Sequence, residues 1–292
     1  DIPAVVQTTK QGFIFAFNRE TGEPIWPIEE RPVPASRVPG EQVSPTQPFP
    51  TKPAAFDLQG RTEKDLIDFT PELRREAEEI LAGYVSGPLF TPPTLIDERP
   101  GGTRGTVQVP GLVGGADWSG AAVDPESGTL YVPTVRTPAV VGLTRSEHPR
   151  SNVDFVMQAL DIAEGPQGLP LLKPPYGRIT AIDLNTGDHI WMVANGETPD
   201  CITDHPALAG VEIPMTGRPE RGGVIVTKAL VFAGEGSGLF AVPGRASGGP
   251  MFRAYDKLTG VVVSEFELPA HQTGIPMTYM LNGTQYIVMA VG

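Results

Sequence analysis

Two stretches of the sequence share one template and decide the fold: AFNRETGEPIW at residues 16–26 and AIDLNTGDHIW at residues 181–191. Both fit the pattern A-x-[ND]-x-x-T-G-x-x-x-W. A degraded third copy, AYDKLTG at residues 254–260, has Ser264 where the tryptophan would stand and Phe266 as the nearest aromatic residue. In each copy alternating apolar residues precede a Thr-Gly turn and an apolar run follows it, which predicts an antiparallel hairpin.

A second kind of hairpin alternates with the first along the chain. AAVDPESGTLYV at residues 121–132 is its clearest copy, and looser copies occupy residues 222–233 and 278–291. In the clearest copy, proline and glycine mark a turn between two short apolar runs. Two alternating hairpins make one unit of four antiparallel strands. The sequence therefore predicts an all-β protein built from repeated four-stranded units.

The composition agrees with many short strands and excludes several classes of protein. The 292 residues include 34 glycines and 32 prolines, too many turn formers for a helical bundle. The net charge of −12 would repel phosphate backbones, so we exclude nucleic acid as a partner. The single cysteine and the four histidines lack the spacing of a zinc site, and no apolar run reaches the length of a membrane helix.

Two long insertions interrupt the repeat. The turn glycines Gly22, Gly187 and Gly260 are separated by more than the roughly 40 to 50 residues of a bare four-stranded unit. We assign the excess to insertions at residues 27–110 and 137–175, both within one domain that spans the whole chain.

The first insertion begins with a proline-rich stretch that we expect to be extended and irregular. It also contains one predicted helix, with Thr70 as the N-cap, Pro71 at the first helical position and Gly83 at the end. We expect this helix to cover the edge of a four-stranded unit. The second insertion is expected to be a loop over one face.

The A-x-[ND]-x-x-T-G-x-x-x-W template resembles the tryptophan-docking motif of the pyrroloquinoline quinone (PQQ) dependent dehydrogenases. TTKQGFIFA at residues 8–16 is similar to the family segment in which a lysine after a strand reaches the quinone. Three further segments resemble the membrane-associated glucose, quinate and shikimate branch of the family. They are SPTQP at residues 44–48, GGADW at residues 114–118 and GIPMTY at residues 274–279.

The resemblance implies a fold and an activity. The fold is part of an eight-bladed β-propeller, about four blades in an arc with a partial blade at each end, and Trp26 and Trp191 are expected to be buried between neighbouring blades. The activity is oxidation of a sugar, polyol or alcohol hydroxyl with PQQ as cofactor and a quinone as electron acceptor. The implied location is periplasmic.

The resemblance also implies that part of the site lies elsewhere. In the family the catalytic aspartate and the ligands of the Ca²⁺ or Mg²⁺ ion mostly precede the lysine that Lys10 matches. We therefore expect this chain to be a piece of a longer protein, without metal ligands of its own and inactive by itself. A preceding region would supply any membrane anchor. An open arc would expose unpaired edges, so self-association of the isolated chain is expected.

Five residues are the candidate site. Lys10 is expected to donate to the quinone oxygens and is the one catalytic residue predicted here. Asp117 stands where much of the branch has asparagine, and it either faces the cofactor or accepts from amides around Gly114 and Gly115. The other candidates for cofactor binding are Trp118, which would otherwise pack within the propeller, and Arg218 and Arg221, which would otherwise form a surface loop paired with Glu220.

A second function remains open at this point. Outer-membrane assembly proteins carry similar repeats, so a non-catalytic propeller that scaffolds protein contacts is the alternative. Lys10 in its T-K-x-G context and the SPTQP segment at residues 44–48 favour the enzyme, because a scaffold needs neither. Neither the individual substrate nor the metal follows from the residues.

Overall fold

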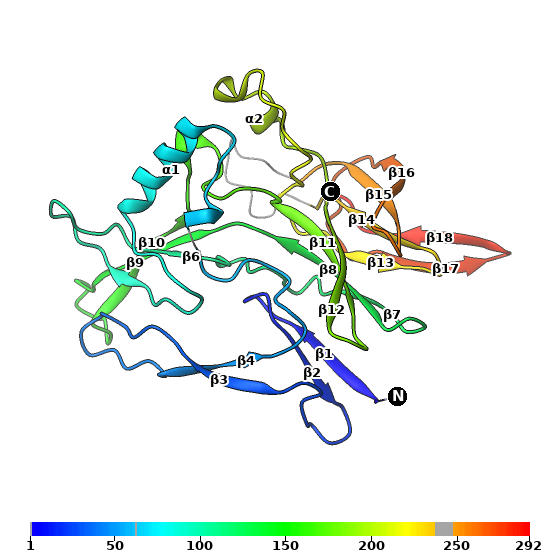
Figure 1. Ribbon diagram of the computed structural model, residues 1–292, viewed down its shortest axis with the longest axis horizontal. Helices are drawn as coiled ribbons and strands as arrows, with labels where there is room; N and C mark the ends of the chain where they lie inside the picture. Colours follow the sequence, from blue (N-terminus) through cyan, green and yellow to red (C-terminus); the bar gives the residue numbers. More distant parts are fainter. Residues whose placement is uncertain (1, 62, 237–247) are drawn as a thin grey trace.

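The computed structural model describes residues 2–61, 63–236 and 248–292. Its main part is a succession of antiparallel sheets that follow one another in chain order (Figure 1). Two of these sheets have four strands each and form complete blades. A two-stranded sheet precedes the first complete blade in the chain, and another follows the second. The predicted partial β-propeller is thereby confirmed.

Each complete blade joins one hairpin of each predicted kind. Because successive side chains alternate across a strand, the apolar periodicity of the hairpins gives each blade two faces to cover. The first complete blade consists of β7 (Ala122–Asp124), β8 (Thr129–Val135), β11 (Gly177–Asp183) and β12 (Asp188–Ala194), and the second of β13 (Val224–Val226), β14 (Leu230–Gly234), β15 (Met251–Asp256) and β16 (Val262–Glu267).

The two partial blades are single hairpins. The hairpin near the C-terminus projects from the body of the molecule (Figure 1). Their strands are β1 (Ala4–Thr8) with β2 (Ile14–Asn18), and β17 (Met277–Leu281) with β18 (Thr284–Val288).

The two central strands of the first complete blade, β8 and β11, are buried on both faces. On β8, Leu130 and Val132 join a cluster with Ile14 of the preceding hairpin, whereas Tyr131 between them joins a cluster with Val231 of the following blade. All seven residues of β8 are buried, as expected for a strand that is covered on both sides. The blades are therefore held together by side chains that alternate between two cores.

Each tryptophan of the template packs on the turn glycine of the next copy. The indole of Trp26 lies over Gly187, and the indole of Trp191 lies over Gly260. The Nε1 atom of Trp191 also donates to the carbonyl of Lys257 at 3.1 Å. Both tryptophans are half-buried, so they are less buried between the blades than we expected. The indoles lie across turns at the edge of the neighbouring blade, where one side stays accessible to solvent.

The two insertions pair with each other, which the sequence did not predict. Four strands form one sheet, in which two strands of the first insertion pair with one strand of a hairpin of the second, on the side opposite its hairpin partner. The second insertion is thus not the loop that we expected, because its apolar run at residues 139–143 finds partners on both sides. The strands are β5 (Thr94–Leu95), β6 (Thr106–Gln108), β9 (Ala139–Arg145) and β10 (Phe155–Ile162).

The proline-rich start of the first insertion is also more regular than expected. It forms an antiparallel hairpin of β3 (Ile28–Pro32) and β4 (Thr46–Pro50), a sheet of only these two strands. Both strands are edges, so a proline without an N–H group can face solvent without breaking a ladder.

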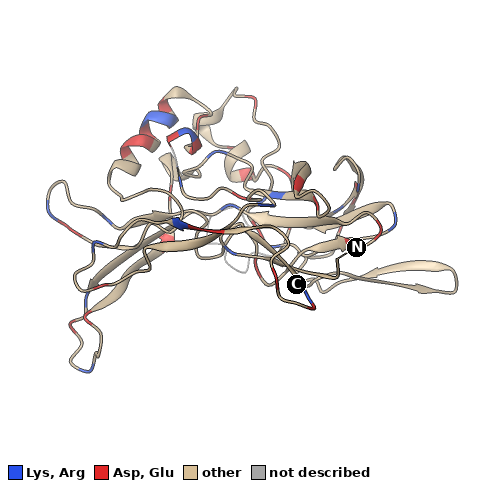
Figure 2. Cartoon of the chain, turned by 60° about the horizontal axis from the view of Figure 1, so that its bottom comes forward, with Lys and Arg blue, Asp and Glu red and all other residues tan. Residues whose placement is uncertain are grey.

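The predicted helix is confirmed as α1 (Pro71–Ala82), in which Thr70 Oγ1 accepts from the amide of Leu73 at 3.2 Å. Figure 2 shows α1 above the layer of sheets, with charged residues along its length. Its buried residues Leu73, Ala77 and Leu81 pack in a core that belongs to the insertions, not on a blade edge as expected. A second short helix, α2 (Asp200–Thr203), was not predicted, and none of the described helices could span a membrane.

A buried ion network joins the first insertion to the first complete blade. The carboxylate of Asp57, whose side chain is 2% exposed, accepts from Arg178 at 2.7 Å and from Arg136 at 3.2 Å. Arg178 donates further to Thr134 Oγ1 and to the carbonyl of Phe56. The amide of Phe56 in turn donates to the carbonyl of Gly12 in the turn after β1. One carboxylate thereby connects the insertion, the blade and the turn that carries Lys10.

Replacing Trp191 with alanine should lower the free energy of unfolding by about 2 kcal/mol, because the half-buried indole loses its contact with the Gly260 turn and its hydrogen bond to Lys257. Trp118→Ala is the matched control: this indole is 61% exposed, and its loss should change stability by less than about 0.5 kcal/mol. Urea denaturation followed by circular dichroism measures both. Equal losses in the two variants would contradict a docking role for Trp191.

Candidate functional site

Lys10 lies in the turn between β1 and β2. The turn is closed by the amide of Thr9, which donates to the carbonyl of Phe13, and Gly12 supplies a positive φ of 81°. The ammonium of Lys10 donates to the carbonyl of Leu112 at 3.0 Å and lies 3.9 Å from Asp117 Oδ2. Its side chain is 54% exposed, so the ammonium is held in place and still open to a ligand.

The loop that carries Asp117 passes directly over Lys10. The amide of Gly115 donates to the carbonyl of Lys10 at 2.8 Å. A Cβ at Gly114 would lie 2.6 Å from Lys10 Cγ, and Gly114 also has a positive φ of 81°. Only glycine tolerates both conditions. The two glycines of the GGADW segment therefore let its backbone pass close to Lys10, and this close approach places Asp117 beside the lysine.

Asp117 connects two of the predicted cations. Its Oδ2 atom is 2.8 Å from Arg221 Nη2 and 3.9 Å from Lys10 Nζ, and its Oδ1 atom accepts from the amide of Trp118. The side chains of Asp117 and Arg221 are both 14% exposed. The carboxylate thus turns toward the cations and not toward the amides of Gly114 and Gly115. We call Lys10, Asp117 and Arg221 the charged triad.

Arg218 belongs to a neighbouring ion cluster. Its Nε atom is 3.3 Å from Glu235 Oε2, and Glu235 also pairs with Arg253 at 2.6 Å. Both Glu235 and Arg253 are 1% exposed in their side chains. Arg218 thus turns to the buried carboxylate of Glu235, which directly follows β14. Of the two arginines, Arg221 is the one whose charge acts on the expected partner Glu220.

Trp118 turns away from the propeller core. It is 61% exposed, so the interpretation that it packs within the propeller was wrong. The reason is local, because its amide is held by the carboxylate of Asp117 while its indole leaves the turn on the solvent side. Contact with a cofactor remains a prediction for this residue.

Glu220 is a residue that sequence reasoning considered only as an ion-pair partner. Its side chain is nearly buried, with 8% of its surface exposed, and burial raises the pKa of its carboxyl group to about 7. The neighbouring Arg221 lowers the pKa but does not cancel the effect of burial. The only sequence signal is its position between the two candidate arginines Arg218 and Arg221, which does not reveal burial.

A cavity opens beside Lys10. Its volume is about 380 Å³, and its walls are Lys10, Gln11, residues 87–91 and residues 107–112. These last two segments belong to the first insertion, apart from residues 111 and 112, which directly follow it. The insertion therefore supplies most of the wall that faces the lysine.

The donor set suits an anionic cofactor. Within the triad two cations share one carboxylate, which leaves a formal charge of +1, and the Lys10 ammonium has three donors of which one goes to Leu112. PQQ carries three carboxylates and an ortho-quinone, so Lys10 and Arg221 fit what this group needs. Among residues 2–61, 63–236 and 248–292, no three His, Cys, Asp or Glu side chains gather as metal ligands would.

Glu220 should make the stability of the protein fall as the pH rises from about 4.5 to about 7. In this window the folded state keeps a proton that the unfolded state has released, because the pKa is raised on folding. Glu220→Gln should therefore become progressively more stable than the wild type across this range, by up to about 3 kcal/mol. Thermal denaturation at several pH values tests this, with the exposed Glu212→Gln as control. A difference between wild type and Glu220→Gln that does not change with pH would contradict the expectation.

Comparison with known proteins identifies relatives along the whole chain. The chain is 30% identical to the glycerol dehydrogenase large subunit of Gluconobacter thailandicus, with 100% of this chain and 40% of the relative covered. It is 29% identical to the quinoprotein glucose dehydrogenase of Escherichia coli, with 100% of this chain and 36% of the relative covered. The chain thus spans about two fifths of the length of these curated relatives.

A solved structure and a family match point to the same group of proteins as these relatives. A solved structure of a europium-containing methanol dehydrogenase is similar with a TM-score of 0.52 at 18% identity, over 98% of this chain and 36% of the other. The family described as PQQ, glucose/ethanol/alcohol dehydrogenase, β-propeller domain, matches residues 1–287. The resemblance inferred from the sequence motifs is confirmed: this chain belongs to the β-propeller domain family of the PQQ-dependent glucose, ethanol and alcohol dehydrogenases.

Proposed function

We propose that this chain forms the lysine side of the PQQ site in a dehydrogenase that oxidises a hydroxyl group of a sugar, polyol or alcohol and passes the electrons to a quinone. The observation that carries the proposal is the charged triad, in which Lys10, Asp117 and Arg221 come together in a propeller of this family. The curated relatives include dehydrogenases of glycerol, glucose and quinate or shikimate. A periplasm-facing location of the whole protein belongs to the same proposal.

The residues of the triad have distinct roles in this proposal. Lys10 and Arg221 bind oxygens of the cofactor, and the Lys10 ammonium stabilises negative charge that develops on them during the reaction. Asp117 holds Arg221 in position at 2.8 Å, and the two cations offset its own repulsion of an anionic group. PQQ, when bound, supplies the oxidising group. Arg218, which is paired with Glu235, and the exposed Trp118 would contact the cofactor only at the edge of the site.

The cavity beside Lys10 is the place we assign to the substrate. Its walls combine Gln11, Thr91 and Gln108 with apolar residues of the first insertion, and Lys10 closes one side. Amide and hydroxyl groups that converge on a wet cavity can exchange hydrogen bonds with the several hydroxyls of a sugar or polyol. This favours a polyhydroxylated substrate over a purely apolar alcohol.

Lys10→Ala in the full-length protein should lower kcat/KM for dye-linked sugar or polyol oxidation by about 10²- to 10³-fold, which is typical for the loss of one donor to developing negative charge. Lys64→Ala is the matched control, since Lys64 is an exposed lysine in the 3-10 turn Glu63–Asp65 of the first insertion. It should leave kcat/KM unchanged. PQQ affinity, followed by titration of the apoprotein, should also fall only in Lys10→Ala. Wild-type kinetics in Lys10→Ala would remove Lys10 from the site.

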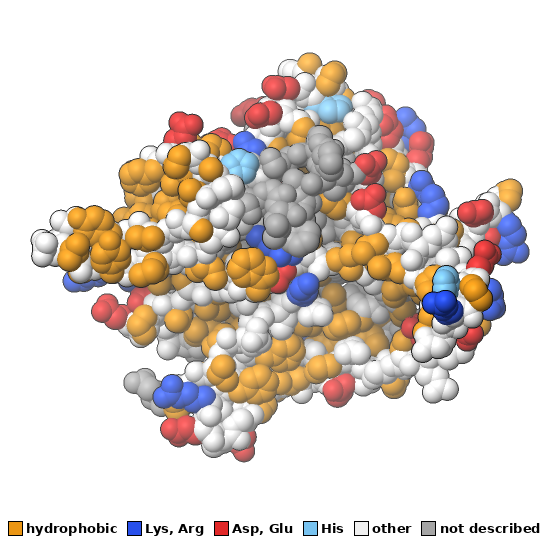
Figure 3. Space-filling view, turned by 180° about the vertical axis from the view of Figure 1, so that it is seen from behind, with side chains coloured by type: hydrophobic (Ala, Val, Ile, Leu, Met, Phe, Trp, Pro, Cys, Tyr) orange, Lys and Arg blue, Asp and Glu red, His pale blue; other side chains and the backbone are white. Residues whose placement is uncertain are grey.

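We further propose that the isolated chain self-associates through β17 and β18. Pairing of the two strands places Met277, Tyr279 and Leu281 on one face with Tyr286 and Val288, and all five are at least 42% exposed. The rings of Tyr279 and Tyr286 stack at 5.2 Å in the middle of this face. Figure 3 shows hydrophobic side chains gathered over the projecting hairpin. An apolar face of this kind on a two-stranded edge favours association with another copy.

Sedimentation velocity at increasing concentration should show dimers or larger species of the isolated chain. Tyr279→Glu, which places a charge in the centre of the apolar face, should shift the chain to monomers. Leu258→Glu is the matched control, because Leu258 is a single apolar residue with 71% exposure on a different blade. The same distribution in both variants, or a wild-type monomer at high concentration, would contradict this interface.

A further inference from the structure

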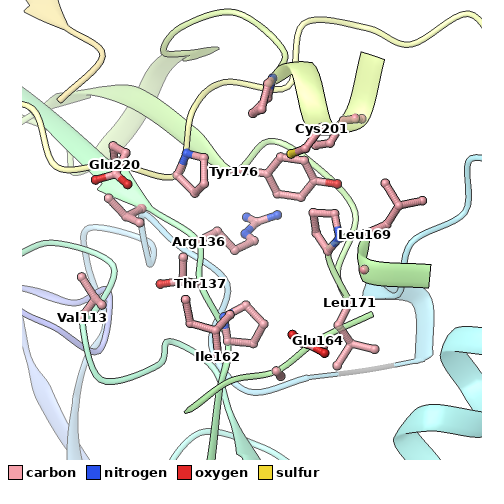
Figure 4. A pocket seen from close by; sticks show the side chains of 18 of the residues that line it. Val113, Arg136, Thr137, Ile162, Glu164, Leu169, Leu171, Tyr176, Cys201 and Glu220 are labelled. Atoms are coloured by element: carbon pink, nitrogen blue, oxygen red, sulfur yellow. The ribbon is translucent and has the colours of Figure 1, made fainter. Parts of the chain in front are cut away.

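A second cavity, about 120 Å³ in volume, lies between the first complete blade, the second insertion and the segment that links the two complete blades. Most of its wall is apolar, and Figure 4 shows its side chains converging from several segments of the chain. This cavity is separate from the one beside Lys10. The residues on which the argument depends are Thr137, Ile162, Tyr176, Cys201, Glu220 and Arg221.

Two hydroxyl groups in this cavity lack a hydrogen-bond partner. Tyr176 is 3% exposed, and neither its hydroxyl nor Thr137 Oγ1 has a partner anywhere in the part of the chain that the structure describes. Buried hydroxyls are normally paired, because water is no longer available to them. Figure 4 shows the ring of Tyr176 beside Cys201, with its hydroxyl directed away from Glu220 and toward Leu169. Two donors in an apolar enclosure fit a ligand that brings acceptor oxygens.

The Tyr176 side chain is held ready for such a ligand. Its amide donates to the carbonyl of Thr216 at 2.7 Å, and its carbonyl accepts from the amide of Arg136 at 2.7 Å. The backbone on both sides of the ring is thereby tied to neighbouring segments. Burial raises the pKa of Tyr176 well above its usual range, so the hydroxyl keeps its proton and remains a donor.

The cavity is next to the charged triad. Glu220 and Arg221 line it, and both also line the small space around Asp117. Arg221, a member of the charged triad, therefore borders the cavity directly. Four acidic or basic residues line the cavity, namely Arg136, Glu164, Glu220 and Arg221.

We propose that this cavity binds a planar, mostly apolar ring with an acceptor oxygen, and that this oxygen accepts a hydrogen bond from the Tyr176 hydroxyl. An apolar cavity of about 150 Å³ holds a benzene ring, so the volume is of the right order for one ring. A sugar does not fit, because most of its hydroxyls would be left unpaired against the apolar wall. The ring belongs either to a quinone or to an aromatic alcohol. Its role in electron transfer or oxidation rests on the function proposed above, whereas its binding does not.

Cys201 is a built-in reporter for the test, because it lines the cavity, is exposed at its surface and is the one cysteine of the chain. The rate of its modification by a maleimide is measured with the purified chain at increasing ligand concentration. The ligands are a fully substituted benzoquinone, whose ring offers no open position to a thiol, benzyl alcohol, and sorbitol as control. We expect a ring ligand to slow the modification in a saturable manner and sorbitol to have no effect.

Variants locate the binding. Tyr176→Phe should raise the half-protecting concentration of the ring ligand about threefold to tenfold, as expected for one lost hydrogen bond, and Thr137→Val should act in the same direction. Ile162→Trp should fill the cavity and abolish protection. Tyr286→Phe, on the exposed face of β18, is the matched control and should behave as the wild type. Circular dichroism confirms that each variant is folded.

The outcomes separate the possible occupants. Protection by the quinone alone identifies a quinone, protection by benzyl alcohol alone identifies the ring of a substrate, and protection by both supports a site for either ring. Absence of protection, equal protection by sorbitol, or identical protection of wild type and Tyr176→Phe would each overturn the proposal. Because no turnover is measured, this experiment can fail while Lys10→Ala behaves as proposed, and it can succeed when Lys10→Ala does not.

Discussion

The buried carboxylate of Asp57 is the constraint on which the arrangement of the molecule depends. Burial of a charge is costly unless partners surround it, and here Arg178 and Arg136 supply them from the blade side of the interface. The same position also fixes the backbone of Phe56 against the turn of Gly12. Ordering of the insertion and placement of Lys10 are therefore coupled, although the lysine makes no contact with the carboxylate in the ion pairs that the structure describes.

The blades could be predicted from sequence because their determinants are local. Each hairpin carries its own apolar alternation and turn glycine, and the tryptophan of one copy finds the turn of the next, as Trp191 finds Gly260. The sheet of the insertions could not be predicted in this way. β5 and β6, which pair with β9, come from segments far away in the chain. The apolar run at residues 139–143 indicates a strand but does not indicate which strands pair with it. The degree to which the tryptophans are buried likewise depends on how neighbouring blades meet.

The candidate site was predicted in part. Residues placed by local motifs could be predicted, and residues placed by contacts with distant segments could not. Lys10 and Asp117 stand in short motifs whose glycines set the backbone, so the resemblance indicated residues that the structure brings within 3.9 Å of each other. Arg218 and Arg221 could not be told apart from sequence, because their partners lie on different segments. The burial of Glu220 arises from the packing of several loops around it. No pattern in its own neighbourhood carries that information.

The shared sheet of the two insertions has a consequence for engineering and for divergence among relatives. Val107 and Gln108 of β6 line the Lys10 cavity, and β6 is held in place by pairing with β9. The wall that the first insertion supplies is therefore supported by the second insertion, a segment that follows it only after the first hairpin of a blade. If only one insertion were replaced by that of a relative, its strands would meet partner strands whose register does not match, and the pairing between the insertions would be lost. Exchange of specificity between relatives therefore requires both segments to be transplanted together, and changes of length in one should be accompanied by changes in the other.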